Sequence, residues 1–299
     1  MNEELAIKLS GVSKAYTHFA LSDIELDLEQ GSIMGFIGPN GAGKSSTMRL
    51  IMGLIKADSG EINVLGHRMP NDQAAAKWDI GFASEDMSLY QTKTLEWHMD
   101  FVKSIYPNWD DDYAKTLCKR FDVIPDQKLK GFSHGQRVKA GLLLVLARRP
   151  KLLLLDEPTT GLDPVARKEV LNELMEVLAD PERTVLFSSH NTKDIEQLSD
   201  QITFIDKGRI IASQDKESFL EQWRRIRFEA PENFSLPELP GVVETQLQGR
   251  LGSVTTKQFD TSLADALQNT GATVKGVENL TLEEIFVTEV MASRTGEAA

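Results

Sequence analysis

The sequence contains one cysteine, Cys118, among 299 residues. A single thiol excludes an internal disulfide and any zinc site built from several cysteines. An excess of basic residues is also missing, since 33 lysines and arginines stand against 45 acidic residues and leave a net charge of −12. Nucleic acid is therefore a poor candidate partner, because phosphate contacts need clustered basic side chains.

Long apolar runs are absent as well. The two longest, 142–147 and 152–155, are separated by a polar segment. Neither approaches the roughly 20 residues that cross a bilayer. Residues 1–4 lack the basic start and apolar core of a signal peptide. We therefore expect a cytoplasmic protein, and the length predicts about two domains.

The most specific feature that is present is a phosphate-binding loop of the pattern G-x-x-x-x-G-K-[ST]. Its glycines let successive backbone N–H groups converge on a polyphosphate. Lys44 is placed to reach the β- and γ-phosphates of a nucleotide, and Ser45 to ligate Mg²⁺. A strand over 32–37 and a helix over 47–52 are predicted around the loop. The residues expected to contact the nucleotide are Gly38, Pro39, Asn40, Gly41, Ala42, Gly43, Lys44, Ser45 and Ser46.

Two carboxylates follow a second apolar stretch. Residues 152–155 predict a buried parallel strand that ends in Asp156 and Glu157. Open α/β sheets bind ligands at this end of their strands. We expect Asp156 to hold Mg²⁺ through water and Glu157 to polarise the attacking water. His190 follows a strand predicted at 184–188, so it is expected at the same edge, near a γ-phosphate.

Two weaker features depend on this context. Tyr16 lies shortly before the phosphate loop and could stack on a nucleobase, although on its own it is an ordinary tyrosine at a strand end. Segment 132–136 leads into an apolar helix, where Ser133 is a good cap and Gly135 allows close approach. By itself, this segment predicts only a capped helix.

The remaining chain suggests two further regions. Helical spacing over 94–105 and 110–121 predicts a helical subdomain at about 87–148. Prolines after residue 225 indicate a boundary, followed by a small α+β unit over 226–299 with a disordered tail from Ala292. The aromatic residues expected in the core of the helical subdomain are Trp97, Phe101, Tyr106, Trp109 and Phe121.

In combination, these motifs resemble the ATP-binding subunit of ABC transporters over about residues 5–225. The resemblance implies an α/β P-loop cassette over 1–225, with a mixed sheet core and a helical subdomain, that binds and hydrolyses MgATP. The family's motifs occur in the family's order: the A-loop aromatic at Tyr16, the phosphate loop, the signature at Phe132–Gln136, Asp156 and the catalytic Glu157, the D-loop with Asp163, and the switch histidine at His190.

Two positions depart from the family's pattern. Glu85 occupies the place of the Q-loop glutamine. A carboxylate there would still meet Mg²⁺, but it cannot donate a hydrogen bond when ionised. His134 replaces a glycine of the signature and adds bulk and a titratable group. Both changes bear on the rate of hydrolysis and leave the fold unaffected.

The resemblance also implies partners. In this family the signature of one cassette closes on the nucleotide of another, so Ser133, Gly135 and Gln136 would contact the ATP of a second copy or a homologous cassette. The head-to-tail dimer would drive a separate membrane permease and lie on the inner face of the cell membrane. Segments 86–110 and 282–286 resemble the branch that extrudes drugs, ions and antibiotics, which favours export.

The alternative is an ABC ATPase without a transport role, in iron–sulfur assembly, DNA repair or translation. Repair members insert coiled coils or zinc modules before the signature, whereas this insert is short and the chain has one cysteine. Translation members carry two cassettes, whereas each motif occurs once here. The additional unit after residue 225 fits iron–sulfur members less well, and a P-loop kinase has no use for the signature.

Overall fold

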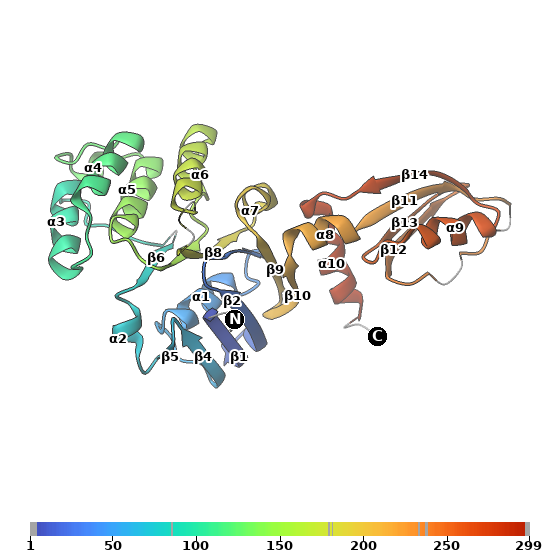
Figure 1. Ribbon diagram of the computed structural model, residues 1–299, viewed down its shortest axis with the longest axis horizontal. Coiled ribbons are helices and arrows are strands. Elements are labelled where there is room, and N and C mark those ends of the chain that lie inside the picture. The colour runs from blue at the N-terminus through green and yellow to red at the C-terminus, as the bar shows by residue number, and fades with distance from the viewer. Residues whose placement is uncertain are drawn as a thin grey trace. The chain divides into compact units, whose positions relative to one another are not determined.

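The computed structural model divides the chain into two compact units, residues 1–210 and 211–299 (Figure 1). Glu85, the expected Q-loop ligand of Mg²⁺, lies outside the residues that the structure describes. Those residues are 5–84, 86–178, 180, 182–232, 234–236 and 239–296.

The first unit contains two sheets. An antiparallel sheet has the strand order β2-β1-β4-β5, and a larger sheet has the order β10-β9-β3-β8-β7-β6. The ladders from β9 through β3, β8 and β7 to β6 are all parallel. The strands are β1 Leu5–Ala15, β2 Ala20–Glu29, β3 Ile33–Ile37, β4 Ser59–Val64, β5 His67–Met69, β6 Ile80–Ser84, β7 Leu152–Asp156, β8 Thr184–Ser189, β9 Gln201–Asp206 and β10 Arg209–Asp215. The last of these strands crosses the boundary after residue 210.

The parallel sheet explains how distant segments meet. Strands β7 and β8 are buried at every residue, as expected for strands covered on both faces. Their register pairs Asp156 with Ser188, while Ile37 at the end of β3 pairs with Ser189. The carboxyl ends of β3, β7 and β8 therefore lie at one edge, each followed by a segment that the sequence marks as functional.

Helices follow the expected capping signals. Ser133 and Gln136 form a reciprocal capping box at the start of α5, and the side chains of Thr94 and Asp110 cap α3 and α4. A short 3₁₀ turn, Leu129–Gly131, precedes α5. The helices of this unit are α1 Lys44–Ile51, α2 Gln73–Ala76, α3 Leu95–Ile105, α4 Asp111–Arg120, α5 His134–Leu146, α6 Pro164–Leu178 and α7 Thr192–Leu198.

One expectation for the helical segment is wrong. Phe121 is buried, but Phe101 is 49% exposed and its ring stacks on Trp97 with centroids 5.4 Å apart. The reason is that α3 buries Leu95 and His98, whereas Phe101 lies beside this buried stripe and outside it. Helical spacing predicted that this segment is a helix, but it did not identify which of the aromatic residues face the core.

The second unit has its own sheet and core. Its sheet has the order β12-β13-β11-β14, and its core contains Ile226, Phe228, Val254 and Leu263. The elements are α8 Lys216–Gln222, β11 Arg224–Glu229, β12 Val242–Gln248, β13 Leu251–Thr256, α9 Thr261–Asn269, β14 Thr273–Asn279 and α10 Leu282–Gly296.

Two features of the chain's helices bear on the sequence expectations. Helix α10 continues to Gly296, so the expected disordered tail is wrong for 292–296, whereas 297–299 lie outside the described residues. The short side chains of Ala292 and Ser293 are compatible with a helix, which the sequence reading overlooked. The second feature concerns membrane spanning. In the described part of the chain, every helix is too short or too polar to span a bilayer.

We predict that a chain ending at Asp215 folds without the rest of the second unit. It retains β10, whose Ile210 packs against the core of the first unit. Thermal unfolding followed by circular dichroism should stay cooperative, with a Tm within about 5 °C of that of the full chain. A chain ending at Asp206, which removes β10, is the control and should unfold earlier. Insolubility or non-cooperative unfolding of the longer chain would contradict independent folding of the first unit.

Candidate functional site

At two positions, the loop between β3 and α1 has a backbone arrangement that only glycine permits. Gly43, the N-cap of α1, has φ 116°, and a Cβ atom there would lie 2.5 Å from Leu21 Cδ2. A Cβ atom on Gly38 would lie 2.5 Å from the carbonyl oxygen of Ile205. The fixed glycines of the motif thus allow the loop to curl tightly over the end of β3 and begin the helix.

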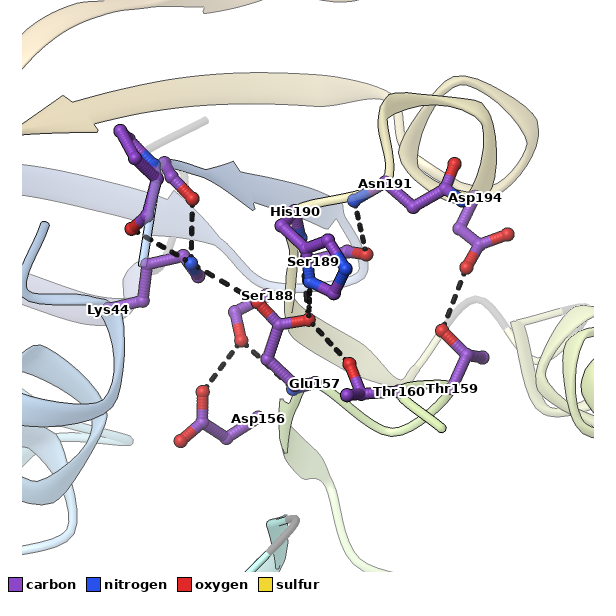
Figure 2. A network of polar contacts seen from close by, with 12 residues as sticks. Lys44, Asp156, Glu157, Thr159, Thr160, Ser188, Ser189, His190, Asn191 and Asp194 are labelled. Atoms are coloured by element: carbon purple, nitrogen blue, oxygen red, sulfur yellow. Dashed lines mark hydrogen bonds and ion pairs between the residues drawn. The ribbon is translucent and has the colours of Figure 1, made fainter. Parts of the chain in front are cut away.

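Lys44 joins this loop to the end of β7. Its Nζ donates to the carbonyl oxygen of Gly38 at 2.7 Å and lies 3.1 Å from Glu157 Oε1 (Figure 2). Glu157 Oε1 forms an ion pair with Lys44 but has no hydrogen bond of good geometry within the described structure. Lys44 is only 5% exposed, so this charge pair is largely removed from water.

Glu157 is the most constrained residue of the site. Its φ is 54°, uncommon for a residue with a side chain, and its backbone N–H donates to Ser188 Oγ at 3.0 Å. Thr160 Oγ1 donates to Glu157 Oε2 at 2.9 Å, and His190 Nδ1 lies 2.8 Å from the same oxygen. Figure 2 shows Thr160 and His190 meeting the carboxylate from different segments.

Electrostatics favour the ionised form of this carboxylate. Burial by itself would raise the pKa of Glu157, but the charge of Lys44 and the polar contacts with Thr160, Lys44 and His190 outweigh burial. The net effect lowers the pKa of Glu157 below its usual value. Glu157 is therefore an ionised acceptor at neutral pH.

Asp156 differs from its neighbour in what it contacts. It is 6% exposed, and Ser188 Oγ donates to its Oδ1 at 2.7 Å, which leaves Oδ2 as the oxygen that can face a metal. The described residues contain no group of three or more His, Cys, Asp or Glu side chains placed to hold a metal. A single carboxylate beside a phosphate-binding loop fits Mg²⁺, which proteins hold through one or two side chains together with substrate phosphates.

A cleft of about 450 Å³ lies over the phosphate loop. It brings Glu157 together with Lys44 and Ser45, as the sequence predicts for a phosphate site. Ala42 is buried and does not line the cleft, and Gly38 is covered by Ile205. The residues that line it are His18, Phe19, Pro39, Asn40, Gly41, Gly43, Lys44, Ser45, Ser46 and Glu157.

Sequence reasoning missed Phe19 and His18. Tyr16, the expected A-loop aromatic, is 42% exposed and is not part of the cleft lining, while Phe19 lines the cleft and stacks on Tyr16 with centroids 6.1 Å apart. The backbone N–H of Tyr16 donates to the carbonyl of Phe19 at 2.8 Å, so a tight turn places both rings together. A second aromatic within three residues of Tyr16 was the available signal.

The signature and D-loop residues lie outside this cleft. Ser133 Oγ accepts from Gln136 N at 3.1 Å, and His134 Nε2 lies 3.4 Å from the carbonyl oxygen of Thr160. A Cβ atom on Gly135 would lie 3.4 Å from Ala166. Asp163 accepts hydrogen bonds from the backbone of Val165 and Ala166, which lowers its pKa. Within one chain, these residues cap helices and support the Glu157 turn.

Comparison with known proteins gives a consistent result. Residues 21–160 match the family model described as ABC transporter. The chain is 30% identical to the ABC transporter ATP-binding protein YtrB of Bacillus subtilis, over 96% of this chain and 99% of YtrB. It is 34% identical to the daunorubicin/doxorubicin resistance ATP-binding protein DrrA of Streptomyces peucetius, over 69% of this chain and 64% of DrrA.

Solved structures agree with the fold. An ATP-binding subunit of an ABC transporter matches with a TM-score of 0.66 and 25% identity, over 73% of this chain and 92% of that subunit. A dimeric ATP-binding cassette bound to ADP and phosphate matches with a TM-score of 0.63 and 21% identity, over 70% of this chain and 98% of that cassette. The second likeness concerns the fold alone.

The lowered pKa of Glu157 predicts how the site contributes to stability. Ionised Glu157 stabilises the folded state above its unfolded pKa of about 4.3, and this contribution is lost as the pH falls through the folded pKa. We therefore compare the free energy of unfolding of the wild type with that of Glu157→Gln. The difference in favour of the wild type should be constant above about pH 6 and should shrink below about pH 5. Urea unfolding at pH 7, 5 and 4 measures it. An advantage that grows on acidification would contradict this assignment.

Proposed function

Since this chain belongs to the ABC transporter ATP-binding family and is an ATPase, we propose that it is the energy-supplying subunit of an exporter. Two copies, or one copy and a homologous cassette, would bind two ATP molecules head to tail and drive a separate membrane permease. The observation that carries the proposal is the Lys44–Glu157 contact, because it joins a phosphate-binding loop to an ionised carboxylate within one cleft.

ATP hydrolysis needs each group of the cleft in a different role. Lys44 would leave Glu157 for the β- and γ-phosphates, because a phosphate is the more highly charged acceptor. Glu157 Oε1 would then be free to accept a proton from water, while Thr160 and His190 hold Oε2. Ser45 and Asp156 would hold Mg²⁺, which neutralises charge on the phosphates when bound. The rings of Phe19 and Tyr16 would stack on adenine.

A dimer would complete the site. Ser133 is exposed and, together with Gly135 and Gln136, lies outside the cleft of its own chain. Ser133 stands at the N-terminus of the 13-residue helix α5, where the helix dipole favours an anion. We assign this helix start to the γ-phosphate of ATP bound by the partner cassette, with the D-loop residue Asp163 beside it.

The permease is assigned to an aromatic patch, defined as Tyr90, which precedes α3, together with Trp97 and Phe101 of α3. Tyr90 is 66% exposed, and its ring contacts Trp97 edge to face with centroids 5.8 Å apart. Exposed stacked rings favour an apolar protein partner. The drug-resistance names of DrrA and of the 32% identical linearmycin resistance protein LnrL of Bacillus subtilis support export, with the chain held at the cytoplasmic face by the permease.

Glu157→Gln should produce an ATP-stabilised dimer. Glutamine keeps the shape of the side chain but cannot act as a base, and its lack of charge reduces repulsion of the γ-phosphate. ATP that is not hydrolysed favours the closed form by mass action. Size-exclusion chromatography with light scattering should give a dimer with MgATP and a monomer with ADP.

Ser133 offers a matched pair of control variants in the Glu157→Gln background. Ser133→Thr and Ser133→Asp both keep an N-cap for α5, but the aspartate places a negative charge against the partner's γ-phosphate. The threonine variant should dimerise and the aspartate variant should not. A Glu157→Gln protein that stays monomeric in saturating MgATP, or equal dimerisation of the two Ser133 variants, would refute the head-to-tail site.

A further inference from the structure

We propose that Asp194 is a positioning residue for hydrolysis, because it ties together the two segments that hold Glu157. The proposal rests on the role of Glu157 as general base and extends it to a residue four positions after His190. Asp194 lies on α7, does not line the cleft, and is 2% exposed.

Both oxygens of this buried carboxylate are engaged by other elements. Thr159 Oγ1, in the turn after β7, donates to Asp194 Oδ2 at 2.8 Å (Figure 2). Arg167, on α6, donates to Oδ1 from Nε at 2.9 Å and from Nη2 at 2.5 Å. One side chain therefore connects α7, α6 and the turn that follows the catalytic strand.

These connections control the surroundings of Glu157. Thr159 is adjacent to Thr160, which donates to Glu157 Oε2. At the start of α7, Asn191 caps the helix by accepting from Lys193 N at 3.0 Å. His190 precedes Asn191 and contacts Glu157 Oε2, the oxygen that Thr160 also contacts. The Asp194–Thr159 bond thus holds two segments together. One is the turn that contains Thr160, and the other is helix α7, which begins beside His190. Loss of the bond leaves both segments free to shift around the carboxylate.

A buried ion pair is a poor source of stability, because desolvation offsets much of the attraction. A side chain placed at such a cost is better explained by the geometry that it imposes. Small displacements of catalytic groups are expensive, with an error of about 1 Å costing up to about a hundredfold in rate. Asp194→Ala should therefore lower kcat by about 10- to 100-fold. The KM for ATP should change by less than about twofold, because no residue of α7 lines the cleft.

A matched control separates positioning from general loss of stability. Glu173 is also a carboxylate with 3% exposure, lies on α6, and accepts from Tyr113 Oη at 2.8 Å and Arg120 Nη1 at 3.0 Å. Asp194→Ala leaves the buried Thr159 hydroxyl without its acceptor, and Glu173→Ala does the same to the half-buried Tyr113 hydroxyl, so both should lower Tm. Only Asp194→Ala should lower kcat in the folded protein.

Thr159 supplies a second readout. Thr159→Ser keeps the hydroxyl and should keep kcat near wild type, whereas Thr159→Val removes the donor and should reproduce most of the Asp194→Ala loss. If Asp194 acts through Thr159, adding Asp194→Ala to Thr159→Val should lower kcat further by less than about threefold. The loss in the double variant would then be much smaller than the product of the two single losses in kcat. Independent, multiplicative losses would overturn the proposed connection.

Steady-state ATPase assays on the full chain, with Tm measured for each variant, decide between the outcomes. Turnover of Asp194→Ala within twofold of wild type, or an equal loss in Glu173→Ala, would overturn the proposal. Glu157→Gln is assayed in parallel. If it abolishes turnover while Asp194→Ala does not, only the positioning role fails; if Glu157→Gln remains active, the general-base assignment itself fails.

Discussion

The ion pair between Lys44 Nζ and Glu157 Oε1, 3.1 Å long, is the contact on which the rest of the site depends. Both groups are largely buried, and each sits on strained or glycine-dependent backbone: Gly43 has φ 116° before Lys44, and Glu157 has φ 54°. Backbone in such conformations persists only where its surroundings determine it, and it gathers at functional sites. Here the strain places a cation and a carboxylate face to face across one cleft.

The parallel sheet provides the frame for this contact. Because β3, β7 and β8 end in register, the phosphate loop, Glu157 and His190 emerge from one edge although they are far apart in sequence. Ser188 links these two neighbouring residues, because its Oγ accepts from the backbone N–H of Glu157 and donates to Asp156 Oδ1. In the proposed mechanism, Asp156 would hold the metal and Glu157 would act on water, so the two carboxylates would have the separate roles that phosphoryl transfer requires.

The sequence predicts those parts of the site that depend on local pattern. The phosphate loop and the two carboxylates were predictable, because glycine spacing and an apolar strand determine their conformation and position. Phe19, Asp194 and the exposed face of α3 were not. Phe19 joins the cleft through a turn with Tyr16, and Asp194 contacts α6 and the turn after β7. Phe101 is exposed because it lies outside the stripe of α3 that is buried. Each of these depends on packing between distant segments, which periodicity does not specify.

The central claim is that Lys44 exchanges Glu157 for the phosphates of ATP. Titration with a fluorescent ATP analogue and Mg²⁺ tests it most directly, with Arg49→Ala as a matched control, since Arg49 lies on the same helix in an exposed pair with Asp86. Lys44→Ala should weaken affinity by roughly 30-fold or more, because charge-assisted hydrogen bonds to phosphate are lost, and Arg49→Ala should bind like wild type. Unchanged affinity of Lys44→Ala would contradict the account.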